Sequence, residues 1–466
     1  MKNNSDLHRF FNPGKIAVVG ASSKEGKIGR IVFERLMHSK RILFPVNPAE
    51  NVLFGNRVYK DVLEINDTID LAVITTPADR AVKALEECAI KGIPYAIIVA
   101  GGFGEAGPEG IELQKKIGEI LKKYKISMLG PNTLGVFLPK EGIDTIFVEH
   151  GDESLAGGGT IACILQSGSV GVEALGYASN TGFGMRAFIG LGNKIDLNEI
   201  DFLNYFSSDP NTNCIAFYLE NIENGKKFLN DAKKVTVSKP VIVLKAGRTE
   251  KGAIAVSSHT GKLAGFDNVV SGAFKQYGIQ RVFDDEELCD AAKALSYLPL
   301  PNGNRIAVIT PAGGYGVMCT DYIEKNDPRA MLKMASLTEK TKKIIRKSTF
   351  NFASCNNPVD ITAGATNEMF GKSLKATISD NGVDIIICIA FFAPPGISYD
   401  LIDIISKEVK KSSKPVLVFT QFGPFTDDIL KQFFNKRVVG FPSIYRTVRA
   451  CRFLVERKEI LNTLGK

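Results

Sequence analysis

Long apolar runs, paired cysteines and clustered basic residues are all missing from this 466-residue chain. No stretch approaches the ~18 apolar residues of a membrane span, and the opening MKNNSDLHRFFNPGK has no apolar signal core. The eight cysteines include no CxxC pair, which argues against a disulfide framework or a metal site such as zinc. Lys+Arg 58 against Asp+Glu 50 form no long basic run, which argues against nucleic acid. We expect a protein of the reducing cytoplasm, with neither a membrane nor a nucleic-acid partner.

Short β-branched runs alternate with longer amphipathic stretches, the pattern of α/β layers with parallel sheets. Strands predicted at Ile16–Val19, Ile161–Leu165 and Ile306–Ile309 are evenly spaced, and each runs into a glycine- or serine-containing loop and a helix. Because one core rarely exceeds ~250–300 residues, we expect three α/β domains. Three unrelated α/β units would give the same spacing. The predicted domains are a dinucleotide-fold-like domain over 1–145 and flavodoxin-like domains over 155–298 and 303–466.

The loop Gly20–Gly29, with the sequence GASSKEGKIG, joins the first strand to a helix. Free N–H groups and the positive end of the helix dipole hold phosphate at such a position. Lys24, Lys27 and Arg30 add positive charge. We predict a phosphate site, although a tight turn with solvated lysines would look the same.

The same loop departs from the dinucleotide fingerprint. Ser22 replaces the second glycine of G-x-G-x-x-G, and Asn47 stands where an acidic residue would bind the ribose. A Rossmann oxidoreductase is therefore disfavoured. The cations suit a ligand with an additional phosphate group, as CoA has.

Only four histidines occur in the chain. His259 lies in SSHTG, which we expect to be a glycine–serine loop with a helix after it. Small neighbours there would leave its imidazole accessible as a nucleophile. A turn that merely contains a histidine is the alternative.

Three further segments follow predicted parallel strands of the same domain. They are Gln166–Ser169, the GLGNK run from Gly190 to Lys194, and Glu220. Open α/β sheets place their ligands at these carboxyl ends. A carboxylate there could fix the tautomer of His259 and stabilise the cation that forms when the imidazole is phosphorylated.

Taken in order, ten motifs resemble the α subunit of ADP-forming acetyl-CoA synthetases (acetate–CoA ligases) and, more distantly, the α subunit of succinyl-CoA synthetase. They are VVGASSKEGKIG, FPVNP, TTPA, VAGGFGE, LGPNTLGV, LQSGSVG, GLGNKIDL, YLENIE, KAGRTEKGAIAVSSHTGKLAG and ITPAGGYGVMCTD. The resemblance implies a Rossmann-like CoA-binding domain followed by two flavodoxin-like, succinyl-CoA synthetase-like domains.

The resemblance also implies a phosphoryl relay. Phosphate attacks acyl-CoA, His259 takes the phosphoryl group from the acyl phosphate, and ADP receives it. Glu220 matches the acidic partner of the histidine. One departure is Thr133, where relatives often have cysteine. The segments that match CoA contacts contain Gly20, Ser22, Ser23, Lys24, Lys27, Pro45, Asn47, Thr76 and Pro77. Those at the acyl and phosphate end contain Asn132, Gln166, Ser167, Gly168, Ser169, Gly192 and Asn193.

No Walker A match and no spare length for an ATP-grasp domain are found in the chain. By resemblance, ADP or ATP with Mg²⁺ would bind a separate ATP-grasp β subunit, in an α2β2 assembly. A CoA-sensing regulatory module without phosphorylation of His259 is the non-enzymatic alternative. The acyl group, the physiological direction, the choice between ADP and GDP and the role of the third domain cannot be read from the sequence.

Overall fold

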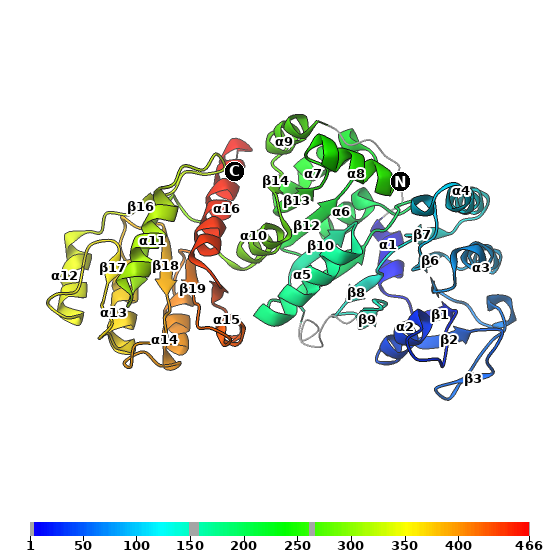
Figure 1. The fold of residues 1–466 in the computed structure, drawn as a ribbon, viewed down its shortest axis with the longest axis horizontal. Helices are drawn as coiled ribbons and strands as arrows, with labels where there is room; N and C mark the ends of the chain where they lie inside the picture. The colour runs from blue at the N-terminus through cyan, green and yellow to red at the C-terminus, as the bar shows by residue number, and fades with distance from the viewer. Residues whose placement is uncertain (1–3, 149–157, 261–265, 466) are drawn as a thin grey trace. The chain divides into compact units, whose positions relative to one another are not determined.

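The computed structural model describes residues 4–148, 158–260 and 266–465, without the side chains of 4–6, 179 and 257–260. Its sheets are mainly parallel and alternate with helices, which confirms the predicted α/β class (Figure 1). The chain forms two compact units. One contains Met1–Gly176 and Gly184–Asp285, and the other contains Tyr177–Phe183 and Glu286–Lys466. The three predicted domain boundaries stay a prediction.

The first unit opens with a five-stranded parallel sheet. Its strands are, in spatial order, β2 (Ile42–Val46), β1 (Lys15–Val19), β5 (Leu71–Ile74), β6 (Tyr95–Ile98) and β7 (Ser127–Leu129). Alternate residues of β1 face opposite sides. Ile16 and Val18 pack with helix α2 (Ile28–Met37), and Ala17 and Val19 pack with α3 (Ala78–Ile90) and α4 (Pro108–Lys123). Both faces of the sheet are therefore buried, as expected for parallel strands.

A seven-stranded sheet lies in the same unit. Its order is β14 (Gln280–Val282), β13 (Val241–Lys245), β12 (Cys214–Leu219), β10 (Ile161–Leu165), β11 (Met185–Gly190), β8 (Val136–Leu138) and β9 (Ile143–Asp144). Strands β10 to β14 are parallel, and β8 and β9 are added antiparallel at the edge. The expected first domain ended at residue 145, but β8 and β9 pair with the second sheet.

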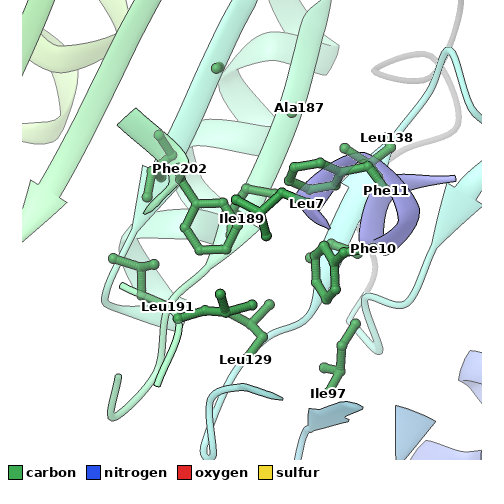
Figure 2. Packing of buried hydrophobic residues seen from close by; sticks show 14 of the residues in the cluster. Leu7, Phe10, Phe11, Ile97, Leu129, Leu138, Ala187, Ile189, Leu191 and Phe202 are labelled. Atoms are coloured by element: carbon green, nitrogen blue, oxygen red, sulfur yellow. The ribbon is translucent and has the colours of Figure 1, made fainter. Parts of the chain in front are cut away.

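Helix α1 (Asn4–Phe11) joins the cores of these two sheets. Its Phe10 and Phe11 are each 1% exposed. Figure 2 shows them among Ile97 of the first sheet, Ile189 of the second and Phe202 of helix α6 (Glu199–Ser208). One continuous hydrophobic cluster thus includes residues of both sheets, and it holds their loops in a defined relation.

The second unit contains a six-stranded parallel sheet. The path is β16 (Lys333–Met334), β15 (Arg305–Thr310), β18 (Ile385–Ile389), β19 (Val416–Phe419) and β20 (Val439–Phe441), and β17 (Val359–Asp360) also pairs with β15. A separate two-stranded hairpin, in the first unit, consists of β3 (Val52–Leu53) and β4 (Asn56–Arg57).

In each large sheet, one strand lies between the next strand in the chain and a later one. These central strands are β1 between β2 and β5, β10 between β11 and β12, and β15 between β16 and β18. The winding direction reverses at β1, β10 and β15, where open α/β sheets bind ligands. The remaining helices are η1 (Val62–Glu64), η2 (Gly104–Ala106), α5 (Gly168–Thr181), α6 (Glu199–Ser208), α7 (Gly225–Thr236), α8 (Glu250–Thr260), α9 (Asp267–Gln276), α10 (Asp285–Tyr297), α11 (Gly313–Glu324), α12 (Glu339–Ser348), α13 (Asn367–Ile378), α14 (Asp400–Val409), α15 (Thr426–Asn435) and α16 (Ile444–Thr463).

All eight cysteines are buried and unpaired. Within the described residues, no helix is both long enough and apolar enough to cross a bilayer. The same part of the chain contains no group of three His, Cys, Asp or Glu residues placed to hold a metal ion.

Candidate functional site

A cavity of about 480 Å³ lies in the first unit, lined by loops that follow strands of both its sheets. Eight of the residues singled out from the sequence line it: Asn132, Gln166, Ser167, Gly168, Ser169, Gly192, Asn193 and Glu220. The first of these follows β7, and the others follow β10, β11 and β12. Segments that lie far apart in the sequence thus meet at one place.

The loops after β7 and β11 approach each other closely. A Cβ atom on Gly192 would lie 2.2 Å from the carbonyl oxygen of Pro131, and Gly192 has φ +60°. Only glycine tolerates both conditions. The N–H of Asn193 donates to the same Pro131 carbonyl at 2.9 Å. This contact fixes Asn132, which was predicted at the acyl and phosphate end, beside the GLGNK loop.

The side chain of Gln166 holds the start of the loop after β12. Its Oε1 accepts the backbone N–H of Glu220 at 2.9 Å and that of Asn221 at 3.4 Å. Its Nε2 donates to the side-chain oxygen of Asn221 at 2.8 Å. Gln166 therefore orients the backbone that carries Glu220, in addition to lining the cavity.

A buried ion pair holds the other end of that loop. Lys194 donates from Nζ to Glu199 Oε2 at 3.0 Å and to the carbonyl of Asn221 at 2.8 Å. The second carboxylate oxygen of Glu199 accepts the N–H of Glu223 at 2.7 Å. Both charged side chains of the pair are 0% exposed. Since a buried charge is stable only when it is paired and hydrogen-bonded, the loop is part of a rigid network.

Glu105, in the VAGGFGE motif, places another carboxylate in the cavity wall. Burial raises the pKa of Glu105, but hydrogen bonds from the side chain of Asn193 and from the N–H groups of Gly102 and Phe103 outweigh burial, and the pKa is lowered. Asn193 donates to Glu105 at 2.7 Å and to Gln114 at 3.1 Å. Glu105 is therefore a carboxylate at neutral pH.

Tyr218 lies next to Glu220 near the end of β12. Burial first, and then the charge of Glu220 and a hydrogen bond to it, raise the pKa of Tyr218 to about 12. The phenol therefore stays protonated at neutral pH, and its O–H donates a hydrogen bond to the Glu220 carboxylate.

Helix α5 begins at the cavity wall, where Ser167, Gly168 and Ser169 line the space. The hydroxyl oxygens of Ser167 and Ser169 lie 3.0 Å apart. The N-terminal N–H groups of a helix attract anions, so this end of the cavity suits a phosphate or carboxylate. The carboxylates of Glu105 and Glu220 suit a hydrogen-bond donor or a cation. The cavity wall can therefore bind an anionic group at the start of α5 and a donor or cationic group at these carboxylates.

His259 lies in the last turn of helix α8, which corrects the expectation of a glycine–serine loop at this residue. The expected later helix is present as α9 (Asp267–Gln276). Most of helix α8 lies before the histidine. It starts where the hydroxyl of Thr249 accepts the N–H of Gly252 at 3.0 Å, a capping contact that the sequence motif did not reveal. The side chain of His259 and residues 261–265 lie outside the described residues.

The nine residues expected at CoA lie in the loops or strand ends at the carboxyl edge of β1, β2 and β5. Gly20 has φ +91°, and a Cβ atom on Gly29 would lie 1.9 Å from the Gly20 carbonyl oxygen. The side chain of Asn47 donates to the carbonyl of Ala21 at 2.7 Å. Thr76 Oγ1 is buried and has no hydrogen-bond partner among the described residues. The Asn47 bond joins the segments after β1 and β2, and the segment after β5 lies close by, since a Cβ atom on Gly20 would lie 2.9 Å from the Thr76 side chain.

Glu50 was not expected at this loop. Its carboxylate accepts the N–H of Ser23 at 2.9 Å and the hydroxyl of Ser22 at 3.2 Å. Arg30 is paired with Glu34 at 2.8 Å and donates to the carbonyl of Ser23. Lys24 and Lys27, in contrast, are exposed. The exposed positive charges of the loop are thus those of Lys24 and Lys27, and the Glu50 carboxylate lies at its serine end.

Sequence reasoning missed Glu105, Gln114, Asn221 and Glu223 as cavity residues, and it included Lys194 only as part of the GLGNK run. Three of the missed residues lie in the motifs VAGGFGE and YLENIE, whose presence was the available signal. Gln114 lies in α4, one helical turn after Gly110, and nothing in its local sequence distinguishes it.

Three family models match successive parts of the chain. They are described as a CoA binding domain over residues 14–139, a succinyl-CoA ligase-like flavodoxin domain over 158–295 and a Ligase-CoA domain over 306–455.

Similar full-length proteins are also found. The α subunits of ADP-forming acetate–CoA ligases I and II of Pyrococcus furiosus are 36% and 37% identical, over 95% and 94% of this chain and 96% and 94% of theirs. The ADP-forming acetate–CoA ligase I of Archaeoglobus fulgidus is 34% identical over 96% of this chain and 62% of its own length. A solved acetyl-coenzyme A synthetase 1 of Ca. Korarchaeum cryptofilum, in complex with phosphate and ADP, superposes with a TM-score of 0.89 at 33% identity, covering 99% of both chains.

Proposed function

Because the chain belongs to the family of ADP-forming acetate–CoA ligase α subunits, we propose that it is the CoA-binding, phosphoryl-carrying subunit of an ADP-forming acyl-CoA synthetase. The observation that carries the proposal is the shared cavity of eight predicted residues from four strand ends. Its α5 end suits an anion, and Glu220 is held in place beside it.

The proposed reaction has three reversible steps. Phosphate attacks the thioester carbonyl of acyl-CoA, which breaks the C–S bond and gives acyl phosphate and CoA. The imidazole of His259 attacks the phosphorus, and the carboxylic acid leaves as its carboxylate. ADP then attacks the phosphohistidine, which gives ATP and restores the imidazole. A phosphoramidate is labile enough for this return, and a serine phosphate would not be.

Each group in the chain has a stated role in this proposal. Residues of the Gly20–Gly29 loop bind CoA, the start of α5 binds phosphate, and Glu220 stabilises the histidine cation. ADP with Mg²⁺ binds an ATP-grasp β subunit, in an α2β2 assembly. The reducing cytoplasm stays a prediction.

The test starts with the single chain and acetyl phosphate as the phosphoryl donor. We expect an acid-labile, base-stable phosphoryl label on wild type and none on His259→Ala, with CoA affinity nearly unchanged. Together with an ATP-grasp β subunit, wild type should make ATP from acetyl-CoA, ADP and phosphate. CoA binding without any label or ATP would instead indicate a regulatory module.

A further inference from the structure

Lys245, the last residue of β13, is a buried lysine outside the cavity described above. It is 7% exposed. Its Nζ donates to two backbone carbonyls, that of Glu220 and that of Ala246, each at 2.6 Å. It reaches Glu220 because β12 and β13 are neighbours, with Leu219 paired to Lys245. The lysine therefore approaches the residue after β12 from the side of β13.

Gln166 and Lys245 form hydrogen bonds with both backbone groups of Glu220, its N–H and its carbonyl. Gln166 accepts the N–H of Glu220 at 2.9 Å, and Lys245 donates to its carbonyl. Further along the loop, Lys194 and Glu199 hold Asn221 and Glu223. With both peptide groups held, the Glu220 carboxylate can move only by rotating its own side chain. Fixed geometry of this kind is what a charged partner of a reacting group needs.

Groups on every neighbouring element act on the Lys245 ammonium. Burial is the largest effect, and together with the charges of Arg281 on β14 and Lys194 after β11 it lowers the pKa of Lys245 to about 8. Asp267 on α9 and Glu220 act in the opposite direction. Arg248 and Tyr218 line a second cavity together with Lys245. The ammonium thus loses its proton within a pH range where the enzyme can be assayed.

The amino-terminal side of the same strand offers a matched lysine. Lys239 precedes β13 and donates to the carbonyls of Phe206 at 2.9 Å and Asp209 at 2.6 Å. It makes the same kind of contact, but at the opposite edge of the sheet from the cavity. A comparison of the two lysines therefore separates a structural role from a role in the site.

We infer that Lys245 is a positioning residue that holds the Glu220 carboxylate in place for phosphoryl transfer by binding the Glu220 carbonyl. The inference rests on the proposed function, because it assigns Lys245 a part in the same phosphoryl transfer. Lys245 does not line the cavity of the proposed site, so its effect is exerted through Glu220.

The experiment compares Lys245→Met, Lys245→Arg and Lys239→Met in the assembled enzyme with its ATP-grasp subunit. We expect Lys245→Met to lower kcat about 10–100-fold, as the loss of an orienting partner does at metal sites, with KM for CoA within about 2-fold. Lys239→Met should keep kcat within about 2-fold of wild type. The kcat of wild type and Lys239→Met should fall as pH rises through about 8. Lys245→Arg should keep its kcat above that pH, since arginine stays charged.

The outcomes separate the inference from the proposed function. Wild type without ligase activity contradicts the proposed function itself. Active wild type with equal kcat for Lys245→Met and Lys239→Met overturns the inference alone. If Lys245→Met does not fold, the Lys245→Arg profile decides, and an unchanged fall near pH 8 overturns the inference.

Discussion

Gln166 Oε1 accepts the backbone N–H of Glu220 at 2.9 Å, although the two residues are 54 positions apart in the chain. Gln166 follows β10 and Glu220 follows β12, which pair directly as parallel strands. The contact therefore joins the start of helix α5, the proposed anion site, to the proposed acidic partner of the histidine.

Replacement of Gln166 by leucine should break this connection. The N–H of Glu220 would lose its acceptor, which costs about 1–3 kcal/mol for a buried group. We expect phosphorylation by acetyl phosphate to slow at least about 10-fold, because Glu220 loses its orientation. Gln276→Leu, at an exposed position of α9, is the control and should phosphorylate at the wild-type rate. Equal rates in both variants would contradict the role of Gln166.

Phe10→Ala should weaken the join between the two sheets of the first unit. Phe10 packs against Tyr95 with ring centroids 5.6 Å apart and lies in the shared cluster. Truncation of a buried phenylalanine costs about 3–5 kcal/mol, which chemical denaturation would detect as a lower transition midpoint. Phe352→Ala, where the ring is 78% exposed, should change the free energy of unfolding by about 0.5 kcal/mol or less. A Phe10→Ala midpoint as high as that of the control would contradict this packing.

Glu50→Gln should strengthen CoA binding. The Glu50 carboxylate accepts the N–H of Ser23 in the proposed phosphate loop, where its charge repels a polyanion. We expect the Kd for CoA, measured by calorimetry at low salt, to fall about 3–10-fold, with less effect at high salt. Glu25→Gln removes one charge from the exposed part of the same loop and is the control. A similar change in both variants would show a general charge effect, and weaker binding in Glu50→Gln would show that the contact supports the loop.

Asp209→Asn should destabilise the first unit in a pH-dependent way. Arg186 donates to Asp209 at 2.7 Å and to Glu141 at 2.9 Å, and all three side chains are nearly buried. Burial raises the pKa of Asp209, but hydrogen bonds from Thr212 and the charge of Arg186 outweigh burial, and the pKa is lowered. The carboxylate therefore contributes stability above its unfolded pKa of 3.8, and this stability is lost as pH falls through the lower folded pKa.

We accordingly expect Asp209→Asn to lower the free energy of unfolding by about 3 kcal/mol at pH 7. The difference from wild type should shrink as pH falls below 3.8. Urea unfolding at a series of pH values measures both. Asp67→Asn breaks an exposed pair with Lys15 and should have a much smaller effect. A difference for Asp209→Asn that is constant down to acid pH would contradict the role of its charge.

Much of the fold was predictable because it depends on local patterns. The predicted strand Ile161–Leu165 coincides with β10, and the predicted strands Ile16–Val19 and Ile306–Ile309 lie within β1 and β15. Each is a short apolar run between turn residues, and both faces of its sheet are covered, so the run is continuous. The edge strands β8 and β9 were not predicted, because their place depends on pairing with the distant β11. The prediction missed that Ser257 to Thr260 are helical, because the serines and the glycine that follows this segment favour a turn.

By itself, the sequence determined the α/β class, the strand–loop–helix units and the residue types at each strand end, because periodicity and turn chemistry act over a few neighbouring residues. Only the tertiary structure decided which of those strand ends share a cavity. It also decided which side chains are hydrogen-bonded there. Asn193 donates to Glu105, the Glu50 carboxylate accepts the Ser23 N–H, and Lys245 donates to the Glu220 carbonyl. These contacts depend on strand order and on the packing of the two sheets through Phe10 and Phe11, and long-range packing of this kind leaves no mark in the local sequence.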